Sequence, residues 1–290
     1  MRVFVTGGGL GFIGGHVVRA LEAAGHDVDA TFVDVRDRDA LTRAVDGAEA
    51  VVHVAAIYSF TAPEAEIEAV NVGGTANAIA ACRAAGVRRL VATSSCATCG
   101  PVPGRAATEE DSPPPEELTV PYKRTKIEAE RLVLAAEGIE ALCVNPTTPV
   151  GEGDKAPTPT GRMVRGVASG RFRLALRGAG VNLVDVRDVA LGHVLALERG
   201  RPGERYLLGG VDVTLKEAFA LIARAAGRRP PRLELPYAIP RALAAAGLLN
   251  RHEVLLARWP AWFSSEKAKR ELGYEPSPVE AALERAVRDA

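Results

Sequence analysis

Long apolar runs are absent from this 290-residue chain. No stretch approaches the roughly 20 apolar residues that a membrane-spanning helix needs. The N-terminus leads directly into Arg2-Val3-Phe4-Val5, without the charged and apolar regions of a signal peptide. We therefore expect a cytoplasmic protein without membrane insertion.

An excess of charge of either sign is also absent. The 36 Lys and Arg residues balance the 36 Asp and Glu residues, so the formal net charge is zero. No overall field would then recruit nucleic acid or an anionic membrane. Hydrophobic residues at 47% and charged residues at 25% exclude disordered and fibrous classes. The expected partners are small molecules.

Cysteine is scarce, with four residues that show no framework spacing. This predicts reduced thiols and no disulfide scaffold. Cys96 and Cys99 have the spacing of a redox or half-metal motif, but zinc needs further ligands and redox chemistry needs a thioredoxin-like context. We expect two small buried thiols and no metal site.

Strand and helix patterns alternate through the first half of the chain. Strands that read as continuous apolar runs between amphipathic helices are typical of a parallel sheet covered on both faces. The sequence therefore predicts an α/β fold with a Rossmann-type doubly wound parallel sheet. The predicted strands are 3–6, 31–35, 50–54, 89–93 and 141–144, and the helices begin near 12, 37, 63 and 122 and end near 24, 45, 85 and 136.

The amino-acid composition changes after Asn145-Pro146, where a stretch rich in Pro, Gly and Thr begins. We expect a dinucleotide-binding domain over residues 1–146 and a smaller, mainly substrate-binding region over 147–290, with 181–211 returning to the first sheet. Further expectations are helices at 161–169 and 188–198, strands at 172–176 and 182–186, a capping box at Thr214 to Glu217, and short helices after Pro230.

One connection is too short for a plain doubly wound fold. Between Gly25 and Asp34 there is room for one strand only, whereas a mononucleotide-binding half needs two strands and a helix there. Either the protein has lost a strand-helix pair, or a segment is absent from this sequence. The residues leave both alternatives open.

A dinucleotide fingerprint lies where the first strand meets the first helix. Gly9-Leu10-Gly11-Phe12-Ile13-Gly14 would let the backbone approach a pyrophosphate, which the free N–H groups and dipole of the helix would hold. Asp34 lies about where an acid that hydrogen-bonds a cofactor ribose would lie. The alternative is that Asp34 caps the next helix together with Asp37.

Tyr122 and Lys126 are four residues apart, so their side chains share one helix face. A tyrosine has a reference pKa near 10, and nearby positive charge would be needed to bring it toward 7 for general acid/base work. Alone, the pair is more typical of an amphipathic surface helix. Ser94-Ser95 follows a strand, at the edge where parallel sheets bind ligands, although such serines are more often turn residues.

Together these motifs resemble an extended short-chain dehydrogenase/reductase of the NAD-dependent epimerase/dehydratase type. The resemblance covers nearly the whole chain and is closest to the hopanoid-associated sugar epimerase branch, a neighbour of the dihydroflavonol reductases. The segments that carry it are the glycine turn, 34–37, 53–56, 71–75, Ser94-Ser95, 122–126, 145–151, 157–162, 185–190, 207–210 and 264–268.

The resemblance implies that Tyr122 is the catalytic acid/base, that Lys126 binds the nicotinamide ribose and lowers the pKa of Tyr122, and that Ser95 positions the substrate oxygen. It also implies that Asp34 and Val35 contact adenine rather than ribose. The implied cofactor, NAD or NADP, would be bound by Gly8, Gly9, Gly11, Phe12, Ile13, Gly14, Asp34, Val35, Ala55, Ala56, Asn71, Thr93, Tyr122, Lys126 and Pro146. Ser95, Thr148 and Arg162 are the implied substrate-binding residues, and relatives suggest a homodimer formed by the two long helices.

Departures from the family pattern bear on the substrate. The glycine turn carries one extra residue, and Val181 stands where nucleotide-sugar epimerases usually carry a diphosphate-binding arginine. The arginines at 162, 165, 171, 173 and 177 are by default a solvated face, and an anionic substrate group is the minority interpretation. We expect an epimerase or dehydratase, with a carbonyl or 3-hydroxysteroid reductase and a non-catalytic nucleotide sensor as the alternatives.

Overall fold

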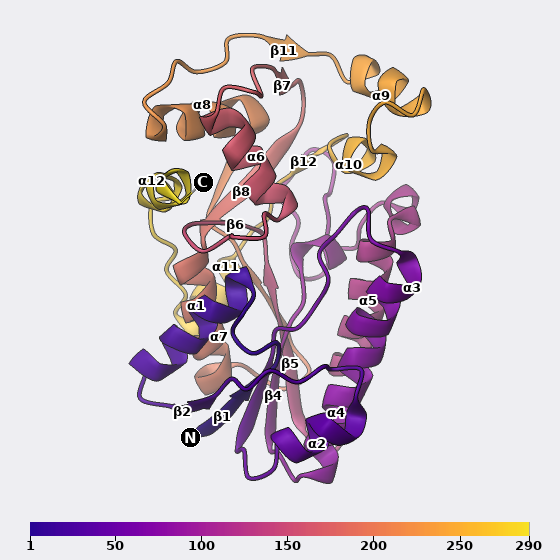
Figure 1. Cartoon of the computed structure of the whole chain (residues 1–290), viewed down its shortest axis with the longest axis vertical. Coiled ribbons are helices and arrows are strands. Elements are labelled where there is room, and N and C mark those ends of the chain that lie inside the picture. The colour runs from indigo at the N-terminus through magenta and orange to yellow at the C-terminus, as the bar shows by residue number, and fades with distance from the viewer. Residues whose placement is uncertain (290) are drawn as a thin grey trace.

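The computed structural model describes residues 1–289, and a six-stranded parallel sheet forms its lower half (Figure 1). The strand order is β2-β1-β3-β4-β5-β9, and every neighbouring pair is parallel. This confirms the predicted Rossmann-type α/β fold. The strands are β1 Arg2–Val5, β2 Asp27–Asp29, β3 Ala50–His53, β4 Arg89–Thr93, β5 Glu140–Pro146 and β9 Arg205–Leu208.

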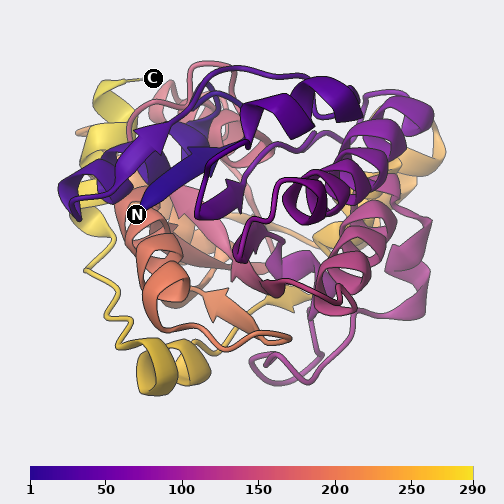
Figure 2. The same ribbon diagram turned by 90° about the horizontal axis from the view of Figure 1, so that it is seen from below.

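Helices cover both faces of this sheet (Figures 1 and 2). One face carries α1 (Phe12–Ala23), α7 (Val186–Arg199) and α11 (Glu266–Leu272), and the other carries α2 (Arg38–Ala44), α4 (Gly74–Ala84) and α5 (Pro121–Leu134). The strands bury both of their faces, which is why they read as uninterrupted apolar runs. Two separate apolar clusters result, one under each helical layer.

The predicted strand at 31–35 was wrong. The strand is β2, because the turn at Gly25 sets Asp27 beside the start of β1, and the Asp27 N–H donates to the Met1 carbonyl at 3.0 Å. The Asp29 carboxylate then accepts from the Thr31 N–H at 2.9 Å, and this local bond turns the chain out of the sheet. Residues 30–34 form no strand, so no outer strand flanks β2 in the described chain.

Two other predicted elements are shorter than expected. The helix expected from 63 to 85 is interrupted: α3 covers Glu64–Glu68, a π-helical turn covers Ala69–Gly73, and α4 follows. The strand expected at 172–176 is reduced to β7, Ala175–Leu176. Propensity alone does not reveal either interruption, because the apolar pattern continues through both segments.

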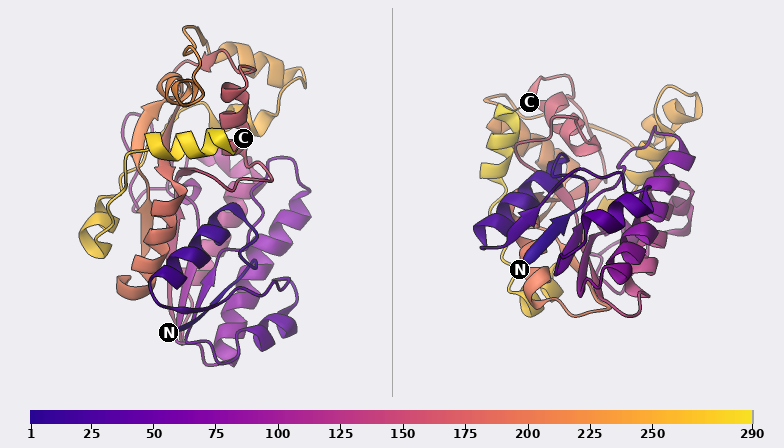
Figure 3. Two further views of the ribbon diagram at one scale, coloured as in Figure 1. Left: turned by 60° about the vertical axis from the view of Figure 1, so that its left-hand side comes forward. Right: turned by 60° about the horizontal axis from the view of Figure 1, so that its bottom comes forward.

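A smaller sheet carries the C-terminal region above the first sheet (Figure 3). β8 (Gly180–Asp185) is its centre, flanked by β10 (Val211–Thr214), β12 (Pro260–Ala261) and β6 (Thr148–Val150). The helices α6 (Pro159–Ala168), α8 (Leu215–Ala225) and α12 (Glu280–Arg288) share an apolar core with this sheet. The capping box at Thr214 is confirmed.

The far end of this region consists of β7 and β11 (Glu234–Leu235), with α9 (Ala238–Ala245) and α10 (Arg251–Leu256) beside them (Figures 1 and 3). Of the segment 181–211, β9 joins the first sheet, whereas β8 and the start of β10 pair in the smaller one. The division at residue 146 stays a prediction. No helix among residues 1–289 combines the length and apolarity that spanning a bilayer requires.

The turn between β9 and β10 connects the two sheets. A Cβ on Gly209 would lie 2.6 Å from the Asn182 side chain, and one on Gly210 would lie 2.3 Å from the Leu183 carbonyl. The Gly209 N–H donates to the Ser265 hydroxyl at 2.8 Å. Only glycines fit this close crossing, which accounts for Gly209-Gly210 and for the serine that precedes α11.

Candidate active site

The glycine turn after β1 leads into α1, and no side chain caps the first N–H groups of this helix. Gly7, Gly8 and Gly9 all have positive φ, at 83°, 63° and 62°, so the extra residue is accommodated by three left-handed positions. Gly11 then caps α1 with extended backbone, without a side-chain cap and without an acidic residue in the first turn. Such a helix N-terminus is suited to bind an anion.

A cleft of about 330 Å³ lies beside this turn. Its lining includes six of the predicted cofactor-binding residues, namely Gly11, Gly14, Asp34, Val35, Ala55 and Ala56, together with Thr6, Gly7, Phe32, Val33, Arg36, Val54, Glu66 and Val70. Gly8 lies under the segment that follows β2, because a Cβ there would be 2.9 Å from the Phe32 Cβ. The cleft is therefore built by the turn, by the end of β3 and by residues 32–36.

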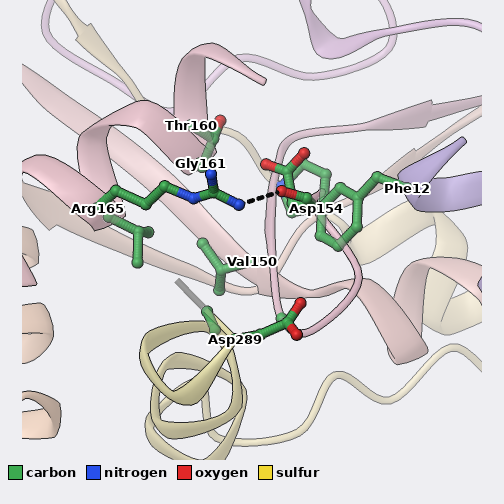
Figure 4. Close-up of a pocket in the computed structure, with 11 residues that line it drawn as sticks. Phe12, Val150, Asp154, Thr160, Gly161, Arg165 and Asp289 are labelled. Atoms are coloured by element: carbon green, nitrogen blue, oxygen red, sulfur yellow. Dashed lines mark hydrogen bonds between the residues drawn. The ribbon is translucent and has the colours of Figure 1, made fainter. Parts of the chain in front are cut away.

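Phe12 lines a second, much smaller cavity, of about 20 Å³, on the other side of the α1 N-terminus (Figure 4). Arg165 and Asp154 face each other across it, and the Arg165 guanidinium donates to the Asp154 carbonyl at 2.8 Å. Asp289 accepts from the Gly153 N–H at 2.6 Å. Arg165 thus bonds to Asp154 and Asp289 to Gly153, so these polar groups already have partners within the chain. The cavity lies between α1, α6 and the end of α12.

Asp34 pairs with Arg36 at the rim of the large cleft. The guanidinium and N–H groups of Arg36 lower the pKa of Asp34 to about 2. Asp37, and not Asp34, caps α2 by accepting from the Ala40 N–H at 2.9 Å. The capping alternative for Asp34 was therefore wrong.

A chain of buried hydrogen bonds fixes the glycine turn to β3 and α4. The Thr75 hydroxyl donates to the Asn71 carbonyl at 2.6 Å, so His53 Nε2 is the donor of its 3.1 Å bond to Thr75 and His53 Nδ1 accepts from Thr6 at 2.9 Å. The Thr6 oxygen in turn accepts from the N–H groups of Val54 and Ala55. Burial lowers the pKa of His53 to about 3, which keeps this ring neutral.

Tyr122 and Ser95 meet at the carboxyl end of β4. Burial raises the pKa of Tyr122, and the nearby Ser95 side chain partly offsets this effect. The Tyr122 ring lies 4.6 Å from the ring of Tyr58 and 6.3 Å from the ring of Phe60. Sequence reasoning missed this aromatic wall, because Tyr58 and Phe60 lie in the loop after β3 without any motif.

Lys126 lies one helical turn below Tyr122 and donates to the Thr93 carbonyl at 2.7 Å. Burial lowers the pKa of Lys126 to about 8. His193 donates through Nδ1 to the Val189 carbonyl, so its Nε2 accepts from the Thr93 hydroxyl at 2.8 Å.

Asn71 lies in the π-helical turn and bonds within the chain. Its side-chain oxygen accepts from the Ile57 N–H at 2.8 Å, and its amide donates to the Ile57 carbonyl and to the Thr125 hydroxyl. Asn71 thereby joins the loop after β3 to α5. A π-helical turn is a common device at functional sites, and here it sets Asn71 between two walls of the site.

Under the Ser95 loop lies a buried polar network centred on Glu130. Its carboxylate accepts from Thr98 at 3.0 Å, from Asn145 at 2.5 Å and from Arg205 at 2.6 Å. Asn145 also donates to the Ser95 carbonyl at 3.1 Å. The resemblance pointed to Asn145, but Glu130 and Arg205 were not found, since nothing in their spacing brings α5 and β9 together.

The remaining predicted residues lie around this centre. Pro146 is buried at the end of β5, and Thr148 is half-buried in β6. Arg162 is exposed on α6 and forms an ion pair with Glu253 of α10 at 2.9 Å. Of the two thiols expected to be buried, Cys99 is buried whereas Cys96 is only half-buried. Burial raises the pKa of both to about 12, which lowers their reactivity.

Comparison with known proteins agrees with the family that the sequence motifs resemble. The profile of the NAD dependent epimerase/dehydratase family matches residues 3–209. Sterol demethylase protein B of Methylococcus capsulatus is 33% identical over 99% of this chain and 97% of its own. The 2-alkyl-3-oxoalkanoate reductase of Stenotrophomonas maltophilia is 32% identical over 98% of each chain. Among solved structures, the NAD complex of UDP-glucose 4-epimerase from Thermus thermophilus has a TM-score of 0.78 at 25% identity and covers 100% of this chain and 98% of that one.

The two sequence alignments span 324 and 332 positions, more than the 290 residues of this chain. The relatives therefore contain internal residues that this chain lacks. This difference agrees with the short connection after β2, where the described chain has no outer strand.

Proposed function

The chain belongs to the NAD-dependent epimerase/dehydratase family, and on this premise we propose that it moves a hydride between a nicotinamide and a carbinol or carbonyl carbon, with Tyr122 as acid/base. The observation that carries the proposal is the meeting of Tyr122, Ser95 and Lys126 at the carboxyl edge of the parallel sheet, next to the cleft of the glycine turn. Ligands of open parallel sheets bind at that edge.

The residues of the cleft fit a dinucleotide such as NAD or NADP. A Cβ on Gly11 would meet no atom within 4 Å, so backbone and open space face the cleft at this point. The α1 N–H groups would hold the pyrophosphate, and Ala55, Ala56, Val35 and Asp34 would line the adenosine end.

The chain's own residues would handle the proton. Ser95 would donate a hydrogen bond to the substrate oxygen, and Tyr122 would give a proton to that oxygen during reduction or take it during oxidation. The nicotinamide, when bound, supplies or accepts the hydride. Lys126 would hold the ribose by hydrogen bonds, and its charge together with the oxidised cofactor would oppose the effect of burial on Tyr122.

We favour a reductase or dehydrogenase of a substrate with apolar rings or chains. The aromatic wall of Tyr58 and Phe60 stands directly against Tyr122, and a flat apolar surface there suits an apolar neighbour of the reacting carbon. The relatives named for a sterol and a 2-alkyl-3-oxoalkanoate support this choice. The second candidate is a sugar epimerase, which the likeness to UDP-glucose 4-epimerase favours.

We propose that the protein works in the cytoplasm, as is general for the family. We also propose a homodimer in which α3–α4 and α5, which lie next to each other on one side of the sheet, pair with their copies.

Cofactor titration tests the proposal. The protein, freed of bound nucleotide by denaturation and refolding, is titrated with NAD⁺, NADH, NADP⁺ and NADPH. Gly11→Ala should weaken binding by roughly tenfold or more, because its methyl group enters the pyrophosphate site. Gly73→Ala, which also meets no atom within 4 Å, is the matched control and should bind normally. No binding of any nucleotide would disprove the proposal.

Turnover then separates the two candidates. A reductase consumes one reduced nucleotide for each substrate molecule converted, whereas an epimerase returns the hydride to the same substrate and leaves the absorbance of the nucleotide unchanged after turnover. A panel of alkyl ketones, 3-ketosteroids and UDP-hexoses covers both classes.

A further inference from the structure

The far end of the C-terminal region, formed by β7, β11 and the segments that lead into them, carries a local excess of positive charge. Residues 169–179 and 224–241 contain eight arginines and one glutamate, although the whole chain is neutral. We define the cationic tip as the six exposed arginines nearest to the β7–β11 pair, which are Arg171, Arg173, Arg177, Arg228, Arg229 and Arg232.

These six guanidinium groups have no acidic partner. None of them lies within ion-pair distance of a carboxylate in the part of the chain that the structure describes. The one acid between them, Glu234, lies 3.7 Å from Lys216. By contrast, Arg36, Arg124, Arg162, Arg187 and Arg258 elsewhere on the surface are each paired with a carboxylate.

Large apolar side chains are exposed between these arginines. Phe172 is 41% exposed, Leu174 43% and Leu233 69%. β11 pairs with β7 in parallel register, with Glu234 opposite Ala175. Continuing this register by one residue sets Leu233 beside Leu174, so the apolar side chains form a small group and are not scattered singly.

From these two observations we infer that the cationic tip docks on an anionic lipid bilayer surface. Guanidinium groups bind lipid phosphates, while Leu174 and Leu233 enter the boundary between headgroups and acyl chains. The aliphatic side chains decide against nucleic acid, because leucines gain nothing from a phosphate backbone. Docking of this kind needs no spanning helix, and it is independent of the proposed reaction.

Vesicle flotation of the full chain tests this inference. Binding is expected to vesicles of phosphatidylcholine mixed with phosphatidylglycerol, to be absent with phosphatidylcholine alone, and to weaken as salt rises. Duplex RNA at the same concentrations is the competing ligand. Equal binding to both kinds of vesicle, no binding to either, or binding to RNA without binding to anionic vesicles would overturn the inference.

Charge variants measure how much the arginines contribute to vesicle binding. R171Q/R173Q/R232Q should lower the partition coefficient onto anionic vesicles by about 100-fold, since each arginine near the surface contributes roughly fivefold. R38Q/R43Q/R88Q removes the same charge from exposed, unpaired positions on α2 and before β4, and should bind as the parent chain does. Equal losses in both triple variants would mean a net-charge effect and would refute a localised tip.

Apolar variants separate docking from simple electrostatic attraction. L174S/L233S should reduce the partition coefficient by about tenfold or more, whereas L118S/L191S, at comparably exposed leucines away from the tip, should leave it unchanged. Thermal midpoints and nucleotide binding confirm that each variant is folded. An unchanged partition coefficient for L174S/L233S would contradict docking on lipid.

Discussion

The buried groups around Ser95 and Tyr122 form what we call the active-site floor. This floor and the far end of the C-terminal region are built in opposite ways. Around Ser95 and Tyr122, side chains such as Asn145, Thr125 and His193 are essentially fully buried, and each is hydrogen-bonded to a neighbouring residue. At the far end, α10 has no buried residue and α9 buries only Pro240. A hydride-transfer site needs fixed geometry, whereas a surface that meets large or variable partners does not. The comparison predicts which substitutions will be costly.

The largest effect is expected at Tyr122, the proposed acid/base. Tyr122→Phe removes the phenol and should lower kcat by about 10²- to 10⁴-fold, while the affinity for nucleotide stays close to that of the parent chain. Tyr237→Phe, before α9 at the far end, is the matched control. Steady-state kinetics and nucleotide titration measure the two quantities separately. Undiminished activity in Tyr122→Phe would end the proposed mechanism.

The largest loss of stability is expected in the network under the Ser95 loop. Glu130→Ala removes the buried carboxylate that Thr98, Asn145 and Arg205 share, and leaves the half-buried Arg205 guanidinium without a carboxylate partner. The free energy of unfolding should fall by about 3–5 kcal/mol. Denaturant unfolding measures it, with the neighbouring exposed residue Glu128→Ala as control. A loss below about 1 kcal/mol would mean that the network is not structurally important.

Lys126 makes the same floor sensitive to pH. Burial lowers its pKa from 10.5 to about 8, so between these values the unfolded chain binds more protons than the folded one and stability rises with pH. The shift corresponds to about 3 kcal/mol. The buried cysteines act in the opposite direction at high pH, so the comparison must be with Lys126→Met. The advantage of Lys126→Met should shrink from pH 8 to 10.5, and a constant difference would contradict the assignment.

The two regions also differ in how much of them could be predicted from sequence. The parallel sheet, the glycine turn and the Tyr122/Lys126 face follow from local periodicity and spacing, and the structure confirms the first two. The displaced strand could not be predicted, because a single Asp29 side-chain bond and a tight turn at Gly25 overrode the apolar pattern of residues 31–35. Glu130, Arg205 and Tyr58 act across long sequence separations, which no local pattern reports.

The smallest effect is expected where the far end contacts the rest of the chain. Glu253 of α10 pairs with Arg162 of α6, and both side chains are nearly half exposed. Such pairs contribute about 0–1 kcal/mol, so Glu253→Ala should barely change the free energy of unfolding. Glu284→Ala on α12 is the control for stability. A loss of several kcal/mol in Glu253→Ala would show that the far end is as tightly fixed as the active-site floor, and the contrast between the two regions would then be wrong.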